Sequence, residues 1–394
     1  NPSFVEALLD EILKFKAEEA KRFAEAGVDY IMLSDDIGIQ NSMRFSPHIW
    51  RRFLKPRMKK LIQEAKKKGQ ITHVFYHSDG YFDPVIPDLI EVGVDMLNPI
   101  QPEAMDPSYI KQRYGAEAIA TSSGTGRTHD EYRIRFFNLL GSPNNIGQGL
   151  ICFGPGSMVS RAIYGWPDFT PAVGRSTKCI MLLGTNPEQA AKGLWLPILE
   201  SLRGGAKLIV VDPRQTVAAQ RADIWLQLRP GTDCALYMSM INTIIGEELY
   251  DKDFVGRWCY GFDQLAKRAQ DYPPEKVADI TWVPAEKIKQ AARMYATIKP
   301  AVIVHAMGLE QLANSIEAIH ARYILTAITG NLDVRGGEEL RSAHPQLREE
   351  YEIELNEKLS PEQKKKQIGA EQFKLFSRYG NELINKTAKS RLSS

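Results

Sequence analysis

Two short apolar runs with one helical stretch between them constrain the fold of this chain more than any other feature of its sequence. The runs CIMLL (179–183) and KLIVV (207–211) have the length of buried strands, and residues 190–202 have the apolar spacing of a helix. Parallel strands need such a crossover, whereas antiparallel strands can be joined by a tight turn. The segment therefore predicts a βαβ unit and an α/β protein with parallel sheets.

Residues 1–115 repeat this alternation of helices and short strands. A long helical stretch is followed by the strands VDYIMLS, ITHVFYH and VDMLN, and polar residues such as Asp35, Asp36 and His77 stand at the strand ends. Polar strand ends form the active face of a (β/α)8 barrel. We therefore expect residues 1–115 to form a partial barrel-like segment.

A second α/β domain is predicted over residues 116–340. Besides the first βαβ unit, it contains the runs EAIATSS, PAVIVHAM and ILTAITG, each followed by a loop of glycine or polar residues. We predict a strand in each run and a Rossmann-like parallel sheet. Residues 341–394 are polar and mixed in charge, and the Ser-Pro pair of SPEQKKKQ predicts the start of a helix in this tail.

Two helix starts near the N-terminus have recognisable capping residues. Ser3 and Glu6 have the spacing of a capping box. Ser46 before Pro47 combines a cap residue with proline at the first helical position. The chain opens NPSFVEALL, without methionine, so we expect a fragment or a processed chain.

Composition excludes several classes of function. The formal net charge is +2, which gives no electrostatic reason to expect nucleic acid or a membrane surface as a partner. The sequence has no apolar run of the roughly 18 residues that a transmembrane helix needs. The four cysteines form no CxxC pair, which argues against structural zinc and a disulfide framework and fits a reducing compartment. We expect a cytoplasmic protein that acts on a small-molecule substrate.

Three loops that follow strands of the second domain have residues suited to binding a nucleotide. They contain Gly184, Asn186 and Pro187 in the first, Asp212, Pro213 and Arg214 in the second, and Gly231, Thr232 and Asp233 in the third. An acidic residue at a strand end can accept hydrogen bonds from a ribose or a guanine, and an arginine can bind a phosphate. The alternative is a set of surface turns, in which the same residue types are common. No GxGxxG follows a strand, which disfavours an ordinary NAD site.

The motifs LLGTNPEQA, VVDPRQTVAAQRADIWLQLRPGTDCAL and HAMGLEQLANS…ITGNLDVRGG resemble the molybdopterin oxidoreductases of the DMSO reductase family. That family includes formate dehydrogenases and acetylene hydratase, and the resemblance extends over residues 114–394. It implies a bis-molybdopterin guanine dinucleotide cofactor with Mo or W, and an electron-transfer subunit as a partner. Guanine or ribose contacts would come from Asn186, Asp212, Arg214 and Asp233, and contacts nearer a pterin from Met307, Gly308 and Gln311.

Cys152 lies on a loop of small residues in the stretch NNIGQGLICFGPGS. The family places a cysteine, selenocysteine or serine on a loop before the Asn-Pro motif as the metal ligand, so the resemblance implies that Cys152 binds Mo or W. A soft thiolate suits such a metal. The alternative is an inert buried cysteine. The expected reaction at the metal is oxygen-atom transfer, transfer of a hydride equivalent, or hydration. The cysteine cluster with which most of the family binds an iron–sulfur centre is absent from this sequence.

The first segment resembles a different family. GVDYIMLSDDIG, SPHIWRRFLKPRMKKLI and FYHSDGYFDPVIPDLIEVGVDMLNPIQPEAMDP are similar to uroporphyrinogen decarboxylases and cobalamin-dependent methyltransferases. In the methyltransferases a His-x-Cys motif at this strand end binds zinc, whereas this chain has His77 and Asp79 at these positions. His77 is either a site residue or a hydrogen-bonded strand end. Asp35 and Asp36 are either a general acid/base pair or helix-capping acids.

The two resemblances meet near YIKQRYGAEAIA without a linker. A closed barrel needs eight strands, and the first segment offers three, which leaves strand edges unpaired. We therefore hypothesise that the chain joins two truncated family fragments. Two alternatives stay open. In one, the chain is an inactive chimeric fragment. In the other, it is a compact protein whose N-terminal βα units extend the central sheet.

Overall fold

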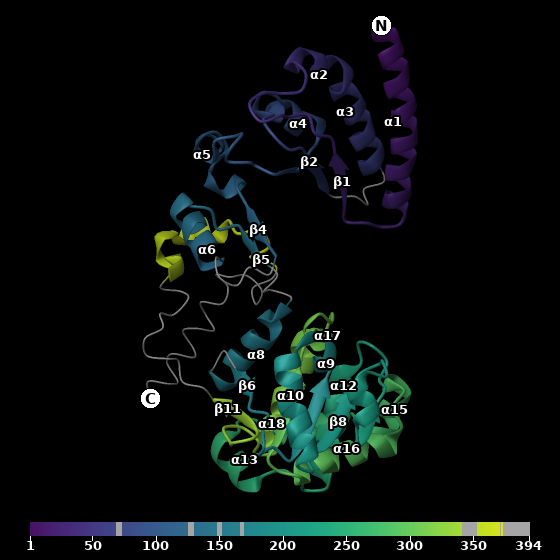
Figure 1. Ribbon diagram of the computed structural model, residues 1–394, viewed down its shortest axis with the longest axis vertical. Helices are drawn as coiled ribbons and strands as arrows, with labels where there is room; N and C mark the ends of the chain where they lie inside the picture. Colours follow the sequence, from purple (N-terminus) through teal and green to yellow (C-terminus); the bar gives the residue numbers. More distant parts are fainter. Residues whose placement is uncertain are drawn as a thin grey trace. The chain divides into compact units, whose positions relative to one another are not determined.

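The computed structural model describes residues 1–67, 73–124, 130–147, 152–165, 169–340, 353–370 and 372. The chain divides into two compact units, Asn1–Ile119 and Ala120–Ser394 (Figure 1). Each unit has its own parallel sheet, because the described strands pair only with strands of the same unit. The alternative in which the N-terminal βα units extend the central sheet is therefore wrong.

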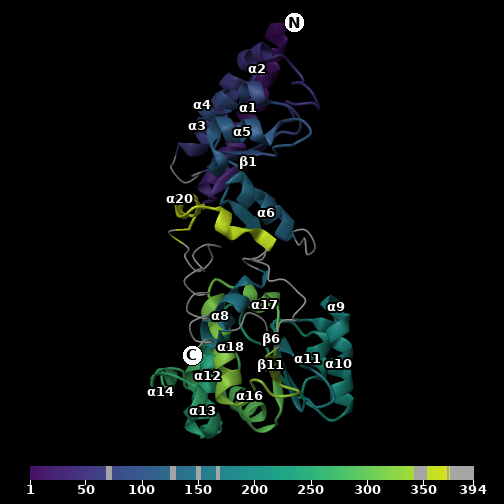
Figure 2. The ribbon, with the colours of Figure 1, turned by 90° about the vertical axis from the view of Figure 1, so that its left-hand side faces the viewer.

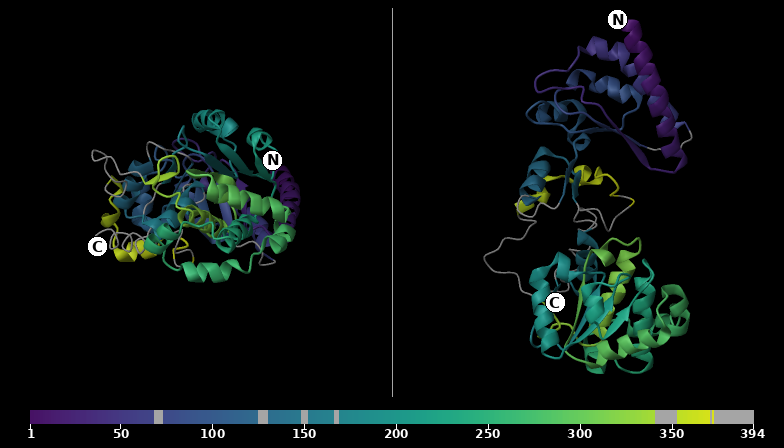
Figure 3. Two further views of the ribbon diagram at one scale, coloured as in Figure 1. Left: turned by 90° about the horizontal axis from the view of Figure 1, so that it is seen from below. Right: turned by 45° about the vertical axis from the view of Figure 1, so that its right-hand side comes forward.

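The first unit contains a three-stranded parallel sheet with the order β1-β2-β3. The long helix α1 and helix α3 lie side by side (Figure 3). The elements of this unit are α1 (Pro2–Glu25), β1 (Tyr30–Ser34), α2 (Pro47–Phe53), α3 (Lys55–Lys66), β2 (His73–His77), the 3-10 turn η1 (Asp83–Val85), α4 (Ile86–Val92), β3 (Met96–Asn98), α5 (Pro107–Tyr114) and the 3-10 turn η2 (Ala116–Ala118).

Only one face of this sheet is buried. Ile31, Val74 and Tyr76 belong to the first unit's core, whereas Tyr30 and Met32 are exposed on the opposite face. Among the described strands, β1 and β3 each pair along one edge only. Parallel sheets are usually covered on both faces, so this arrangement is that of a partial barrel, as the sequence predicts.

The start of α1 differs from the prediction. The helix begins at Pro2, and the Asn1 side chain accepts a hydrogen bond from the Ser3 amide at 3.2 Å. The capping box predicted at Ser3 is wrong, because proline suits the first helical position and places the cap one residue earlier. The start predicted at Ser46 is confirmed, since its hydroxyl accepts from the Ile49 amide at 3.3 Å.

The second unit is built on a four-stranded parallel sheet with the order β10-β7-β8-β9, which confirms the Rossmann-like prediction. Its elements are β4 (Thr121–Ser123), α6 (Asp130–Leu140), β5 (Asn145–Gly147), α8 (Gly154–Tyr164), β6 (Phe169–Pro171), β7 (Cys179–Leu183), α9 (Pro187–Ala190), α10 (Lys192–Arg203), β8 (Lys207–Val211), α11 (Val217–Arg221), β9 (Ile224–Leu226), α12 (Asp233–Gly246), α13 (Lys252–Trp258), α14 (Phe262–Ala269), α15 (Pro274–Thr281), α16 (Ala285–Thr297), β10 (Ala301–His305), α17 (Met307–Glu310), α18 (Ser315–Ile328), β11 (Glu338–Leu340), η3 (Asn356–Lys358) and α20 (Pro361–Lys365).

Helices cover both faces of this sheet (Figures 1 and 2). One face packs Ile180 and Val210 against α10 and α11, and the other packs Met181 and Ile209 against α12, α16 and α18. Neighbouring residues of a strand point to opposite faces. Since both faces of this sheet are covered by helices, every side chain of β7 is buried. The continuous apolar run CIMLL is the sequence signature of this double burial.

The run ILTAITG is not a strand. It lies at the end of α18, where Leu325, Thr326 and Ile328 are all buried. A short apolar run is consistent with either a buried strand or a buried helix, because its periodicity does not separate the two. The strand predicted here is therefore wrong, whereas the strand predicted at AVIVH is confirmed as β10.

Part of the charged tail packs against the second unit. The Asn138 amide of α6 donates to the Glu354 carbonyl at 2.8 Å, and Leu359 is buried. The predicted Ser-Pro helix start is confirmed in α20, where Ser360 and Gln363 form a capping box. Within the described residues, the segment 353–370 is therefore attached to α6, although no residue of α20 itself is buried.

Candidate cofactor site and metal cluster

The loops after β7 and β10 meet at the carboxyl edge of the central sheet. Gly184 has a φ of 53°, and the Gly308 amide donates to its carbonyl at 3.1 Å. A Cβ atom on Gly308 would lie 2.7 Å from that oxygen. Both glycines are therefore needed for the close approach of the two loops to each other, which brings α17 next to the Asn-Pro motif.

Asn186 carries an unpaired acceptor at this edge. It precedes α9, whose first residue, Pro187, is buried. Among the residues that the structure describes, no donor reaches the buried Oδ1 atom of Asn186. Buried polar atoms are nearly always hydrogen-bonded, so this acceptor fits a bound ligand that brings its own N–H group.

The loop after β8 presents a buried carboxylate and an exposed cation. Asp212 is buried, and its Oδ1 atom accepts a hydrogen bond from the Arg214 amide at 2.8 Å. The indole of Trp225 on β9 donates to the Asp212 carbonyl at 2.9 Å and fixes the loop to the neighbouring strand. Pro213 and Arg214 are exposed, so the arginine side chain faces solvent, where a phosphate can be reached.

The third loop leads into α12 and contains a second buried carboxylate. Gly231 has a φ of 83°, and the Thr232 hydroxyl donates to the Arg229 carbonyl at 2.6 Å. Asp233 is 6% exposed and accepts from the Tyr237 hydroxyl at 3.2 Å. Burial raises the pKa of Asp233 to about 6, and the Asp212 charge adds to this rise. The two carboxylates therefore act on each other across neighbouring loops.

The short helix α17 places the remaining predicted contacts beside Gly184. Met307 is its first residue and half-buried, whereas Gly308 and Gln311 are exposed. Gln311 follows the last residue of α17, and its amide donates to the Met307 carbonyl at 3.1 Å. These three residues therefore lie at the same sheet edge as the Asn-Pro loop.

Cys152 is a half-buried free cysteine two residues before the start of α8. It differs from Cys179, which lies in the core with a pKa raised to about 12 by burial. The loop residues 148–151 that precede Cys152 lie outside the described part of the chain. Cys152 is therefore less buried than Cys179.

A buried histidine–glutamate pair that the sequence analysis missed connects α8 to this edge. Glu310 is 2% exposed, and its carboxylate accepts from the Gly156 amide at 3.0 Å. Its other oxygen lies 2.9 Å from Nε2 of His305, the last residue of β10. Burial lowers the pKa of His305. The signal was present in the sequence, because the two residues are the first and the last of the stretch HAMGLE.

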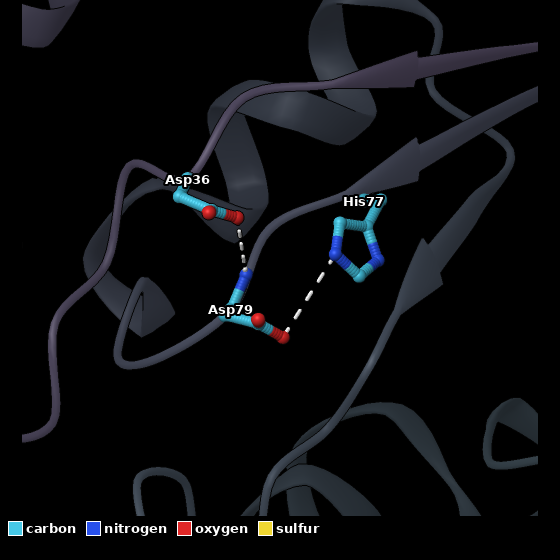
Figure 4. A group of neighbouring side chains, drawn as sticks. All are labelled: Asp36, His77 and Asp79. Atoms are coloured by element: carbon cyan, nitrogen blue, oxygen red, sulfur yellow. Dashed lines mark hydrogen bonds and ion pairs between the residues drawn. The ribbon is translucent and has the colours of Figure 1, made fainter.

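The first unit holds a separate cluster at the ends of β1 and β2 (Figure 4). One ligand atom from each of Asp36, His77 and Asp79 lies within 4.8 Å of the other two. The Asp79 amide donates to the Asp36 carboxylate at 3.2 Å, and His77 Nε2 lies 3.9 Å from an Asp79 oxygen. Imidazole and carboxylate are both ligands of divalent cations, so the cluster can hold a metal ion.

Glycines bring the two loops of this cluster together. A Cβ atom on Gly38 would lie 2.7 Å from the Gly80 backbone, and Gly80 itself has a φ of 77°. Asp36 therefore reaches Asp79, although 43 residues separate them. Only residues without a side chain allow two backbones to approach so closely.

Asp35 is not part of this group. Although the residue is exposed, partial desolvation of its carboxyl group raises its pKa, and the Asp36 charge adds to the rise. Neither acid caps a described helix. The next helix along the chain is α2, and its cap is Ser46. The helix-capping alternative for Asp35 and Asp36 is therefore wrong.

Comparison with known proteins identifies the family. A family model for molybdopterin oxidoreductase matches residues 106–391, and one for uroporphyrinogen decarboxylase matches residues 1–113. The match to the first covers more than half of the chain, so this protein belongs to the molybdopterin oxidoreductase family. Among the described helices, none is long and apolar enough to cross a membrane.

Named relatives place the chain within that family. It is 40% identical to acetylene hydratase of Syntrophotalea acetylenica over 274 residues, which cover 68% of this chain and 37% of the relative. It is 35% identical to formate dehydrogenase H of Escherichia coli (strain K12), covering 57% and 32%. The solved acetylene hydratase from Pelobacter acetylenicus matches with a TM-score of 0.62 and 40% identity, covering 67% of this chain and 36% of that one. The chain thus spans about a third of the length of these proteins.

Proposed function

We propose that this chain binds a molybdopterin guanine dinucleotide cofactor and that Cys152 ligates its Mo or W ion. The observation that carries the proposal is the unpaired, buried Oδ1 atom of Asn186, beside two buried carboxylates on neighbouring loops. A guanine presents N–H donors along one edge, and these are the partners that such acceptors lack. Family membership supports the same cofactor class.

Each loop has a distinct role in this proposal. Asn186, Asp212 and Asp233 accept hydrogen bonds from a guanine or a ribose, and Arg214 binds a phosphate. The half-buried Cys152 supplies a soft thiolate ligand. The bound metal supplies the oxygen-atom, hydride-equivalent or hydration chemistry, and the chain's own residues orient the cofactor. For a redox reaction, the proposal includes the electron-transfer subunit that the family resemblance implies.

The first experiment is the Mo, W and pterin content of the purified full chain beside the Cys152→Ala variant. We expect metal in proportion to protein in the parent chain and its loss in the variant. Cys259→Ala is the matched control, because Cys259 is also a half-buried free cysteine. Absence of metal and pterin from every variant would instead support the inactive chimeric fragment.

A second candidate function belongs to the first unit, and the cluster of Asp36, His77 and Asp79 favours it. We infer a divalent-cation site in a decarboxylase-like or corrinoid methyltransferase-like segment. Two carboxylate oxygens replace the thiolate of the zinc-binding relatives, which suits harder cations such as Mn²⁺ as well as Zn²⁺. The amide oxygen of Asn98 lies 2.8 Å from His77 Nδ1 and can orient the ring, as outer partners of metal-bound histidines do.

Titration of the full chain with Co²⁺, followed by visible absorbance, tests this site. We expect saturable binding that His77→Gln removes. His73→Gln is the control, because His73 lies on the same face at the other end of β2. Equal Co²⁺ binding by both variants would contradict the candidate.

A further inference from the structure

Helix α8 begins without a capping side chain of its own. Its N-cap residue, Phe153, makes no side-chain hydrogen bond to the first turn. The first turn of a helix leaves amide groups without partners inside the helix, so a buried one has to find an acceptor elsewhere. The amide of Gly156, which is buried, donates to the Glu310 carboxylate at 3.0 Å. A glutamate 154 residues away in the chain therefore caps this helix.

The Glu310 side chain is fully buried and uses both of its oxygen atoms. The oxygen that does not cap α8 lies 2.9 Å from His305 Nε2. A Cβ atom on Gly156 would lie 2.5 Å from this oxygen and 3.2 Å from the His305 nitrogen. The start of α8 thus packs directly on the glutamate–histidine pair, and the contact leaves no room for a side chain at Gly156.

The same carboxylate is anchored beside the candidate cofactor loops. Glu310 is the last residue of α17, which lies next to α8 (Figures 1 and 2). The Gly308 amide at the start of α17 donates to the Gly184 carbonyl at 3.1 Å, and His305 ends β10, which pairs with β7. Cys152 lies two residues before the start of α8. The pair therefore connects the Cys152 segment to the edge of the central sheet.

We propose that Glu310 is a positioning residue that fixes the Cys152 segment relative to the Asn-Pro loop. The proposal rests on the proposed role of Cys152 as the metal ligand. Such a ligand has to be held in a fixed place relative to the loops that bind the rest of the cofactor, because small displacements weaken a site. Glu310 binds no metal itself and acts through the backbone of α8. Its negative charge at the positive end of that helix strengthens the contact.

The test measures how fast Cys152 and Cys259 react with iodoacetamide in full chain produced without Mo or W, with each cysteine followed by peptide mass spectrometry. Glu310→Leu removes both hydrogen bonds and releases the start of α8 more often. We therefore expect Cys152 to react at least about fivefold faster and Cys259 at the parent rate. Glu310→Gln keeps an acceptor for the Gly156 amide and should react like the parent. Glu317→Leu is the control, because this glutamate is exposed on α18.

A second variant disturbs the contact from the side of α8. Gly156→Ala places a methyl group against the Glu310 carboxylate and should also accelerate the reaction of Cys152 alone. Equal acceleration of Cys152 and Cys259 would indicate general destabilisation and would overturn the proposal. An unchanged Cys152 rate in Glu310→Leu would do the same, and so would a rate in Glu310→Gln as high as that in Glu310→Leu.

Metal content separates this result from the proposed metal site. In chain produced with Mo and W, Glu310→Leu should hold less metal than the parent, whereas Glu310→Gln should retain it. If Cys152→Ala leaves the metal content unchanged, the assignment of Cys152 as the ligand fails. The iodoacetamide rates then still decide whether Glu310 fixes this segment, because they are measured without the metal.

Discussion

Asp233 is a residue of the candidate site with a pKa of about 6, well above that of an ordinary aspartate. Burial is the main cause of its pKa of about 6, and the hydrogen bond from Tyr237 opposes that rise. The folded-state pKa lies above the ordinary 3.8 of an aspartate. Protonated Asp233 therefore contributes to the stability of the folded chain at low pH, and this contribution is lost as pH rises through about 6. Ionisation of Asp233 thus disfavours folding of the free chain.

The affinity for GDP is expected to rise with pH, whereas the contribution of Asp233 to stability falls. Only ionised Asp233 can accept two hydrogen bonds from a guanine edge, and its ionised fraction rises about tenfold between pH 5 and pH 7. Calorimetric titration of the full chain at pH 5, 6 and 7 should show affinity rising with pH. Asp233→Asn should bind GDP more weakly with a flatter profile. A variant with the same pH slope as the parent would refute the assignment.

Gly308 makes a second residue-level prediction. A methyl group there would lie within 2.8 Å of Gly184 backbone atoms, so Gly308→Ala should reduce the free energy of unfolding by about 1–3 kcal/mol. Gly193→Ala is the matched control, because this exposed position within α10 has open space around it and alanine favours helix. Urea unfolding measures both changes. A loss of equal size in both variants would contradict the packing argument.

At the scale of elements, one buried ion pair connects α18, β10 and β11. Arg322 is 2% exposed and donates to Glu338 at 2.6 Å and to the Ile303 carbonyl at 2.9 Å. Thr326 donates to the second oxygen of Glu338 at 2.8 Å. The pair therefore joins the last strand of the domain to the central sheet through the helix that covers it.

Removal of one partner of this pair is expected to destabilise the second unit strongly. Glu338→Ala leaves Arg322 buried and uncompensated, and the free energy of unfolding should fall by about 3–5 kcal/mol. Glu200→Ala removes an exposed ion pair with Arg175 at 2.7 Å and should cost less than about 1 kcal/mol. Urea denaturation of the two variants gives the comparison, and similar small losses in both would show that the buried pair contributes little.

The two elements that the sequence predicted wrongly have different physical causes. The run ILTAITG is buried on all sides, so its apolar pattern fits a strand as well as the end of α18. At Ser3, the correct spacing of a capping box was overridden by Pro2, which fixes the start of α1 one residue earlier. Burial on every face does not prevent a correct prediction, since the buried strand β10 was predicted correctly, but it removes the periodicity that separates a strand from a helix.

At the scale of the whole molecule, the chain consists of two units with separate sheets and separate cores. Calorimetry of the full chain should therefore show two unfolding transitions. GDP is expected to raise only the transition of Ala120–Ser394, because the candidate dinucleotide loops all lie there. Trp50→Ala should lower the other transition and Ile198→Ala the GDP-sensitive one, since each residue is fully buried in its own unit. A single transition shifted by both variants would contradict independent units.

The sequence by itself determined the parallel α/β class, the strand-end loops and the family motifs, because these depend on local periodicity and on residues close together in the chain. The tertiary structure decided which of the polar residues meet. It joined Asp36 to His77 and Asp79 and left Asp35 outside that group, and it connected Glu310 to Gly156 across 154 residues. Contacts between distant segments depend on how the loops close, and no local pattern specifies that.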